Sequence, residues 1–188
     1  MKNLLSKRTL NKYSRQIILK DVGIIGQKKI FNSKILVVGA GGLGSPVIDL
    51  LVRAGVGFLG VIEDDKVDYS NLHRQTLYDY NDVGKYKSDV IKKKIKLIND
   101  KIKLKTFKER ANDKNLGKIL PKFDIIVDGT DNFPTKFLLN KYSLKYKKKL
   151  VIGAISKFDG HIFSFDFSRK KIPCCLLYTS DAADDASS

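Results

Sequence analysis

The sequence predicts an α/β fold that is Rossmann-like, with a mostly parallel sheet, helices on both faces and an antiparallel extension at the C-terminal side. Short apolar stretches rich in β-branched residues alternate along the chain with longer stretches of helical apolar spacing. The glycine-rich segment 39–44 stands directly between the first expected strand and the helix that follows it. Residues 158–167 alternate apolar and polar side chains, which is typical of a half-exposed antiparallel strand.

The expected elements follow one another in a regular order of strands and helices. Residues 7–31 predict one or two helices, which form an N-terminal lead-in. The apolar run 34–38 predicts a strand, and residues 43–54 predict a helix that tolerates Pro46 in its first turn. The later elements are strands at 57–62, 102–107, 123–127 and 150–155 and helices at 87–98 and 138–146. Alternating strands and helices predict one open, mostly parallel sheet.

The composition is that of one globular domain with an excess of basic residues. The chain has 188 residues, of which 43% are hydrophobic and 10% aromatic. We expect no secretory signal and no run of the ~18 apolar residues that a membrane span needs, and hence a cytoplasmic protein without a membrane partner. The 36 Lys and Arg against 20 Asp and Glu give a net charge of +16. This charge permits a nucleotide, an acidic protein or a nucleic acid as ligand.

The glycine-rich segment has the spacing of a phosphate-binding turn. Gly39 permits the tight turn, Gly41 lets backbone N–H groups approach phosphate oxygens, and Gly44 allows close packing of the helix. This spacing alone is shared by several nucleotide-binding folds, but here it follows a strand and opens a helix. Glu63 ends the second strand about 20 residues later, where an acidic side chain would accept hydrogen bonds from ribose hydroxyls.

Charged residues near the glycine turn point to phosphate chemistry. Asp64 and Asp65 extend the acidic cluster, and an oxygen-rich site of this kind suits Mg²⁺. Arg74 and Lys87 flank the loop after the second strand and would neutralise charge on a reacting phosphate. Binding of NAD requires no such cations, so the pair favours phosphate transfer over hydride transfer.

Asp131 and Asn132 follow the buried run 125–128 and lie at the carboxyl end of another parallel strand. Open α/β sheets bind their ligands at this edge. Asp131 could therefore hold Mg²⁺. Capping of the next helix is an alternative role, above all for Thr130 and Asn132.

These residues together resemble the ThiF/MoeB/HesA family, the bacterial relatives of ubiquitin-activating enzymes, over about residues 9–174. The motifs that carry the resemblance are Tyr13-Ser14-Arg15-Gln16-Ile17, Gly39-Ala40-Gly41-Gly42-Leu43-Gly44, Ala54-Gly55-Val56-Gly57, Ser70-Asn71-Leu72-His73-Arg74-Gln75, Val83-Gly84 with Lys87, and Gly129-Thr130-Asp131-Asn132. The resemblance covers nearly all of the chain before residue 175.

The resemblance implies an adenylyltransferase, which is a nucleotidyltransferase. It would use ATP to adenylate the C-terminal glycine of a ubiquitin-like sulfur-carrier protein ending in Gly-Gly, in thiamine or molybdopterin biosynthesis, and release pyrophosphate. The implied catalytic residues are Arg15, Arg74, Lys87 and Asp131; the implied nucleotide site is Gly39, Gly41, Gly42, Gly44, Glu63, Asp65, Asn71, Arg74, Gln75, Lys87, Asp131 and Asn132. In the family Asp131 would bind Mg²⁺, and Arg15 would reach the active site of the other subunit of a homodimer.

The sequence departs from the family pattern in places. Glu63 stands where aspartate is more usual, and Gly129 stands where cysteine is frequent. Family members commonly bind a structural Zn²⁺ through two Cys-x-x-Cys pairs, and Cys174 resembles the start of the first pair. Cys175 falls at the wrong spacing, so this site is incomplete and we expect no zinc in this chain.

We divide the chain into three parts. Residues 1–32 are the N-terminal helical lead-in, and residues 33–174 are the ATP-binding adenylation domain, truncated at its C-terminal end. From residue 175 the composition changes abruptly to a string that ends in Asp, Ala and Ser and contains no lysine. It resembles translated sequencing-adapter read-through, so we expect residues 175–188 to be a non-native tail.

Three alternatives to the sulfur-carrier function stay open. One is a tRNA threonylcarbamoyladenosine dehydratase of the same family, for which the net charge of +16 makes tRNA a ligand to test. Another is an NAD(P)-dependent oxidoreductase, which would leave Arg74, Lys87 and Asp131 without a task. The third is a scaffold that binds a carrier protein without consuming ATP.

Overall fold

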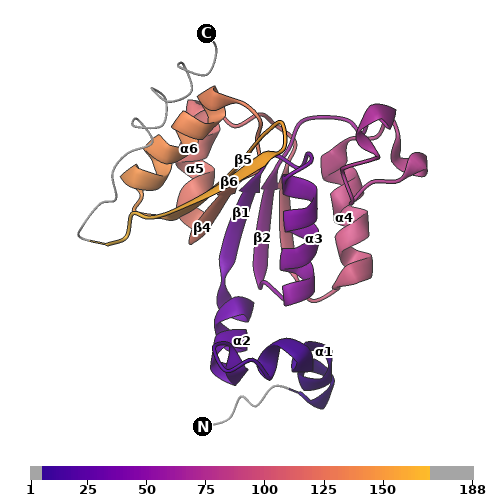
Figure 1. Cartoon of the computed structure of the whole chain (residues 1–188), viewed down its shortest axis with the longest axis vertical. Helices are drawn as coiled ribbons and strands as arrows, with labels where there is room; N and C mark the ends of the chain where they lie inside the picture. The colour runs from indigo at the N-terminus through magenta and orange to yellow at the C-terminus, as the bar shows by residue number, and fades with distance from the viewer. Residues whose placement is uncertain (1–5, 170–188) are drawn as a thin grey trace.

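The computed structural model describes residues 6–169 and has the expected alternation of strands and helices (Figure 1). The helices are α1 (Lys7–Ile17), α2 (Gly23–Asn32), α3 (Gly44–Ala54), α4 (Lys87–Ile98), α5 (Asp113–Ile119) and α6 (Phe133–Lys145). The strands are β1 (Lys34–Val38), β2 (Phe58–Ile62), β3 (Lys103–Phe107), β4 (Ile125–Asp128), β5 (Lys149–Ser156) and β6 (Asp159–Asp166). Helix α5 was not predicted, and α6 begins at Phe133, earlier than the predicted residue 138.

The strands form one sheet in the order β3-β2-β1-β4-β5-β6. The pairs from β3 to β5 are parallel, and β6 joins β5 antiparallel, as the sequence predicts. The order reverses between β1 and β4, which is the switch point at which open α/β sheets bind ligands. Val38 pairs with Ile62 on one side and with Asp128 on the other, so β1, β2 and β4 end side by side.

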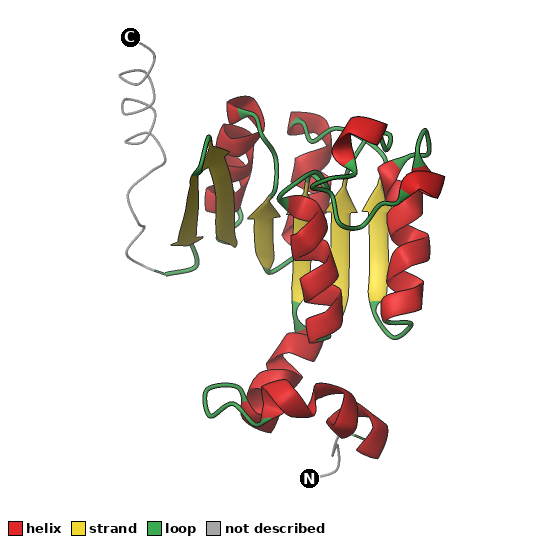
Figure 2. Cartoon of the chain, turned by 45° about the vertical axis from the view of Figure 1, so that its right-hand side comes forward, coloured by secondary structure: helices red, strands yellow, loops and turns green. Residues whose placement is uncertain are grey.

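Helices cover both faces of the sheet (Figure 2). In β1, Ile35 and Val37 point to the face packed by α3 and α4. Leu36 and Val38 point to the opposite face, packed by α5 and α6. Because both faces are buried there, β1, β2 and β4 are apolar at successive positions rather than at alternate ones. The edge strand β3 instead alternates, with Lys103 and Lys105 exposed.

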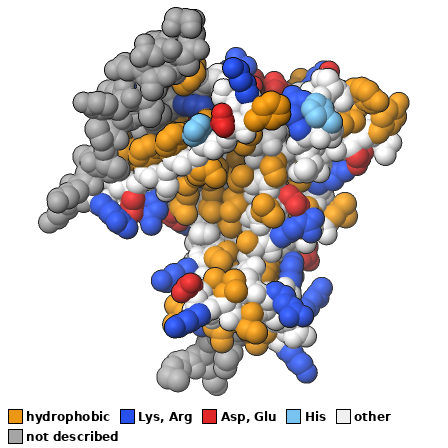
Figure 3. Space-filling model, in the orientation of Figure 1, with side chains coloured by type: hydrophobic (Ala, Val, Ile, Leu, Met, Phe, Trp, Pro, Cys, Tyr) orange, Lys and Arg blue, Asp and Glu red, His pale blue; other side chains and the backbone are white. Residues whose placement is uncertain are grey.

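The N-terminal helices α1 and α2 lie at the end of the sheet where the parallel strands begin, at the bottom of Figure 1. Asn99 Nδ2 lies 3.3 Å from Tyr13 Oη, and Gln27 Nε2 donates at 3.0 Å to the Ala54 carbonyl at the end of α3. These contacts hold the two helices at the end of the domain opposite to the carboxyl ends of the strands. Lys and Arg side chains gather around this end in Figure 3.

The C-terminal part of the chain from residue 170 lies outside the described residues. The expected tail 175–188 and the zinc ligand Cys174 lie outside the described residues. The division of the chain after residue 32 stays a prediction. Among the helices of residues 6–169, none has both the length and the apolar character needed to cross a membrane.

Candidate active site at the carboxyl edge of the sheet

The glycine turn joins β1 to α3 and packs closely against the end of β4. Gly39 has a positive φ of 83°, and its N–H donates to the Ile62 carbonyl at 2.9 Å. A Cβ at Gly44 would lie 1.9 Å from the Gly39 carbonyl oxygen, which leaves no room for any side chain. A Cβ at Gly129 would lie 3.0 Å from the Gly44 Cα. The turn and the Gly129 segment therefore lie in direct contact.

The Glu63 carboxylate holds the backbone of the glycine turn. It is buried, with Oε2 accepting the Ala40 N–H at 2.7 Å and Oε1 accepting the Asp65 N–H at 2.9 Å. The Ala40 carbonyl in turn accepts the Tyr78 hydroxyl proton at 2.9 Å. Burial raises the pKa of Tyr78 well above its usual range, so this hydroxyl stays a donor. The sequence did not indicate these two backbone contacts of Glu63. A ribose hydroxyl would be an additional hydrogen-bond donor to the same carboxylate.

The segment that contains Asn71, Arg74 and Gln75 lies over the glycine turn. A Cβ at Gly41 would lie 3.7 Å from Gln75 Nε2, and one at Gly42 would lie 3.7 Å from Arg74 Cδ. Gln75 Nε2 donates to Asn71 Oδ1. Within the described residues, Gln75 Oε1 is buried and accepts no hydrogen bond. A buried acceptor of this kind calls for a donor from a ligand or water.

The Lys87 ammonium group lies at the start of α4 and is almost completely buried. Lys87 is 4% exposed, and its Nζ lies 3.3 Å from Asp65 Oδ2. The Asp65 side chain is 63% exposed and faces solvent. In residues 6–169 this carboxylate is the one hydrogen-bond acceptor of Lys87 Nζ, which leaves donor capacity for a ligand. Carboxylate oxygens of Glu63, Asp64 and Asp65 lie within 4.8 Å of one another.

Asp131 and Asn132 lie in the segment between β4 and α6, beside the glycine turn. The Gly129 N–H donates to the Val38 carbonyl at 2.9 Å, which fixes the start of this segment to the end of β1. Asp131 is exposed. Asn132 Oδ1 accepts the Thr135 N–H at 3.0 Å, so this side chain caps α6. The capping alternative therefore applies to Asn132.

The structure also contains a buried ion pair that the sequence did not indicate. Lys136 Nζ lies 3.0 Å from Asp128 Oδ2, directly beneath the segment that carries Asp131. Asp128 follows three apolar residues at the end of β4, and a carboxylate placed there needs a buried cation. An aspartate at the end of a buried apolar run was therefore the one sign in the sequence of a buried cation, but it did not indicate which residue supplies that cation.

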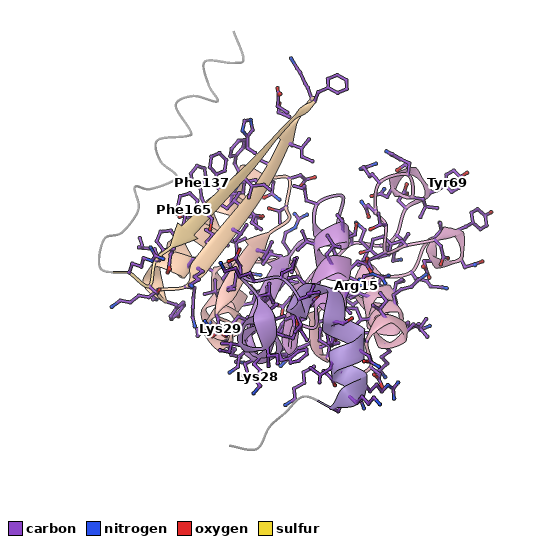
Figure 4. All side chains as sticks on the ribbon, turned by 60° about the horizontal axis from the view of Figure 1, so that its bottom comes forward. Arg15, Lys28, Lys29, Tyr69, Phe137 and Phe165 are labelled. Carbon is purple, nitrogen blue, oxygen red and sulfur yellow. The ribbon has the colours of Figure 1, made fainter. Side chains whose placement is uncertain are left out.

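Arg15 lies apart from the other predicted site residues. It is an exposed residue of α1, at the end of the domain remote from the glycine turn. Figure 4, which brings the bottom of Figure 1 forward, shows Arg15, Lys28 and Lys29 on the N-terminal helices. The structure thus gathers the predicted nucleotide residues at one edge of the sheet but leaves Arg15 at the other.

Comparison with known proteins identifies the family. The sequence model of the ThiF family matches residues 13–187. The chain belongs to the ThiF family. The expected family membership is therefore confirmed.

Curated relatives of this ThiF chain include two adenylyltransferases. The sulfur carrier protein adenylyltransferase of Thermus thermophilus is 44% identical over 160 residues, which are 85% of this chain and 59% of the relative. A probable molybdopterin-synthase adenylyltransferase of Gracilaria tenuistipitata var. liui is 40% identical over 163 residues, 87% of this chain and 46% of the relative. The chain thus spans about half the length of these relatives.

A solved structure shows the same fold as this ThiF chain. The E. coli tRNA N6-threonylcarbamoyladenosine dehydratase TcdA, crystallised in complex with ATP, aligns with a TM-score of 0.74 and 24% sequence identity. The alignment covers 80% of this chain and 61% of TcdA. The Rossmann-like fold predicted from the sequence is confirmed.

Proposed function

We propose that this ThiF-family chain binds ATP at the carboxyl edge of its sheet and adenylates the C-terminal glycine of a ubiquitin-like sulfur-carrier protein. The names of the adenylyltransferase relatives support this proposal. The observation that carries it is the placement of Arg74 over Gly42 and of the buried Lys87 at the same edge. Two cations beside a glycine turn suit a triphosphate better than a dinucleotide that undergoes hydride transfer.

The residues of the site fit ATP as a substrate. The glycine turn offers backbone N–H groups without side chains that would block an approaching phosphate. Within the described residues, the Lys87 ammonium group donates only to Asp65, so its other N–H donors are available to a phosphate. In the same residues, Gln75 Oε1 is a buried acceptor without a donor. Ribose hydroxyls and the adenine amino group are the donors that ATP would bring to such an acceptor.

In the proposed reaction the carrier carboxylate attacks the α-phosphate of ATP. A bond forms between the carboxylate oxygen and the α-phosphorus, the bond to the β-phosphate oxygen breaks, and pyrophosphate leaves with its electron pair. The step needs no nucleophile or base from the protein. Arg74 and Lys87 would position the phosphates and stabilise the charge that develops on them.

Mg²⁺ is the metal that this donor set suits. Exposed carboxylates of Asp131 and Asp65 lie on two sides of the glycine turn, and oxygen ligands are those that Mg²⁺ prefers. We propose Asp131 as the principal ligand. When bound, Mg²⁺ would neutralise charge on the phosphates.

We further infer a homodimer and a cytoplasmic location. Helix α1, which contains Arg15, lies at the end of the domain opposite to the glycine turn of its own chain, as expected of a residue that serves the site of a second subunit. The tRNA dehydratase alternative has less support, because the TcdA likeness is one of fold. Thiamine and molybdopterin biosynthesis differ in the carrier protein, which the assay below identifies.

Exchange of labelled pyrophosphate into ATP tests the proposal. With Mg²⁺ and a carrier ending in Gly-Gly, the chain should catalyse exchange, and a carrier without its last glycine should support none. Arg74→Ala should reduce the rate on the order of 10²-fold, because it removes a cation that stabilises the transferring phosphate. Lys93→Ala, which changes an exposed lysine of α4, is the matched control and should keep the rate.

Exchange without any dependence on the carrier would contradict the proposed substrate. Absence of exchange with every carrier, in a folded protein that binds ATP, would favour the dehydratase or the scaffold. A preference for NAD(P) over ATP in equilibrium binding would favour the oxidoreductase.

A further inference from the structure

Lys136 forms a buried junction beneath the segment that carries Asp131. It belongs to the first turn of α6, and the residue is 7% exposed. Its Nζ donates to Asp128 Oδ2 at 3.0 Å, to the Thr130 carbonyl at 2.9 Å and to the Gly153 carbonyl at 2.9 Å. An ammonium group has three N–H donors, and here each has an acceptor. One side chain thus joins β4, the segment after β4, and β5.

The Asp128 carboxylate completes this junction. Asp128 is 1% exposed, and its Oδ1 accepts both the Thr130 N–H at 2.9 Å and the Thr130 hydroxyl proton at 2.6 Å. Thr130 is therefore held through its amide, its hydroxyl and, by Lys136, its carbonyl. The residue immediately before Asp131 has little freedom to move.

The junction also lies directly behind the glycine turn. A Cβ at Gly39 would lie 3.1 Å from Thr130 Cγ2. A Cβ at Gly153 would lie 3.3 Å from Leu43 Cδ1, so the carbonyl acceptor on β5 belongs to a residue in contact with the turn. A shift of Lys136 would therefore move Asp131 relative to the glycine turn.

Stability of the fold alone gives a weak reason for such a pair. Burying two charges costs desolvation energy, and well-packed apolar residues often serve stability equally well. What an ion pair with several hydrogen bonds adds is a fixed arrangement of the backbone around it. Here that backbone is the one that presents Asp131.

We propose that Lys136 is a positioning residue that, through Asp128 and Thr130, holds the Asp131 carboxylate where it meets the metal of bound ATP. This inference rests on the proposed role of Asp131. It assigns no contact between Lys136 and the nucleotide, since all three of its donors are used within the protein.

Equilibrium binding of ATP without a carrier tests the inference. The double variant Asp128→Asn/Lys136→Met removes both charges, so that neither is left buried and unpaired. The measured quantity is the gain in ATP affinity that Mg²⁺ gives over EDTA. We expect this gain to fall by ~10-fold or more, as loss of a group that orients a metal ligand does, while affinity in EDTA changes less than about threefold.

A cycle with Asp131→Ala decides whether Lys136 acts through Asp131. If it does, adding Asp131→Ala to the double variant should cause little further loss of the Mg²⁺ gain. Additive losses would overturn the inference, as would equal losses with Mg²⁺ and with EDTA. The matched control is Asp113→Asn/Lys141→Met, an exposed pair at 2.9 Å that involves the same helix and should leave the gain unchanged.

If circular dichroism shows that the double variant does not fold, a milder variant provides the same test. Thr130→Val removes only the hydroxyl proton that Asp128 accepts, at nearly constant volume. A reduced Mg²⁺ gain that is not additive with Asp131→Ala would support the inference, and an unchanged gain would overturn it. The binding measurement uses no carrier protein. Its result can therefore be interpreted even if the exchange assay shows that the chain does not adenylate a carrier.

Discussion

At position 44 the lack of a side chain permits a contact between the glycine turn and the start of α3. Gly44 is the first residue of the helix, and the Gly39 carbonyl lies where its Cβ would be. The contact brings the N-terminus of α3 against the turn. Anions bind readily at such a helix start.

Substitution of this glycine should damage the fold as well as the site. We expect Gly44→Ala to lower the free energy of unfolding by about 3 kcal/mol or more, because the methyl group would clash with rigid backbone. Gly160→Ala, where a Cβ meets nothing within 4 Å, should change it by less than ~0.5 kcal/mol. Urea unfolding followed by circular dichroism measures both. Equal stability of the two variants would contradict the packing described for Gly44.

Sequence reasoning placed the glycine turn and its charged residues but missed Lys136. A lysine near the start of a helix usually faces solvent, and the other two lysines of α6, Lys141 and Lys145, are exposed. Lys136 is buried because Gly153, 17 residues later on β5, supplies a carbonyl acceptor. Such a contact depends on tertiary packing, which spacing in the sequence does not reveal.

Among the elements, α6 shows how one side chain sets where a helix begins. Asn132 Oδ1 accepts the Thr135 N–H, and Pro134 occupies the first turn, where its missing N–H costs nothing. The apolar pattern alone predicted a start at 138, because Thr135 and Lys136 interrupt it. Capping rather than periodicity determines the first turn.

The cap predicts a separable effect on stability and on ATP binding. Asn132→Ala should lower the free energy of unfolding by about 1 kcal/mol, and Asn132→Ser, which keeps a capping oxygen, should restore it. Thermal or urea unfolding measures this effect, and ATP titration of the same variants measures affinity. Weak ATP binding by a fully stable Asn132→Ser variant would show a direct contact with the nucleotide. Undiminished stability of Asn132→Ala would refute the cap.

The central strands β1 and β4 were predictable because their residues are apolar and mostly β-branched on both faces. Helix α5 was missed for a physical reason. It has seven residues, among them Gly117, and the side chains of Asn112 and Asn115 form its capping box. Asn112 accepts the N–H groups of Lys114 and Asn115, so local polar contacts rather than an apolar stripe start the helix.

On the scale of the molecule, the distance between Arg15 and the glycine turn is informative. Helix α1, which contains Arg15, lies at the opposite end of the domain from the turn between β1 and α3 (Figure 1). A catalytic role for Arg15 therefore requires a second copy of the chain.

Complementation between inactive variants tests this requirement. Arg15→Ala and Asp131→Ala should each lose exchange activity, and their co-expression should restore about a quarter of it. Random pairing makes half of the dimers mixed, and each mixed dimer has one intact site. Arg74→Ala with Asp131→Ala is the control and should not complement, since both residues belong to one site. Lack of complementation by the Arg15 pair would place Arg15 outside the partner's site.

The strand order has a consequence for how the protein is made. β4 lies beside β1, although β2, α4 and β3 are synthesised between them. A nascent chain that has left the ribosome as far as β3 has its glycine turn but no Gly129 segment to pack against it. The hydrogen bonds of Lys136 can be completed only later, when Gly153 on β5 has been synthesised. We therefore expect nucleotide capture to begin only when nearly the whole sheet has emerged, so that ATP binding in the cell marks a finished domain.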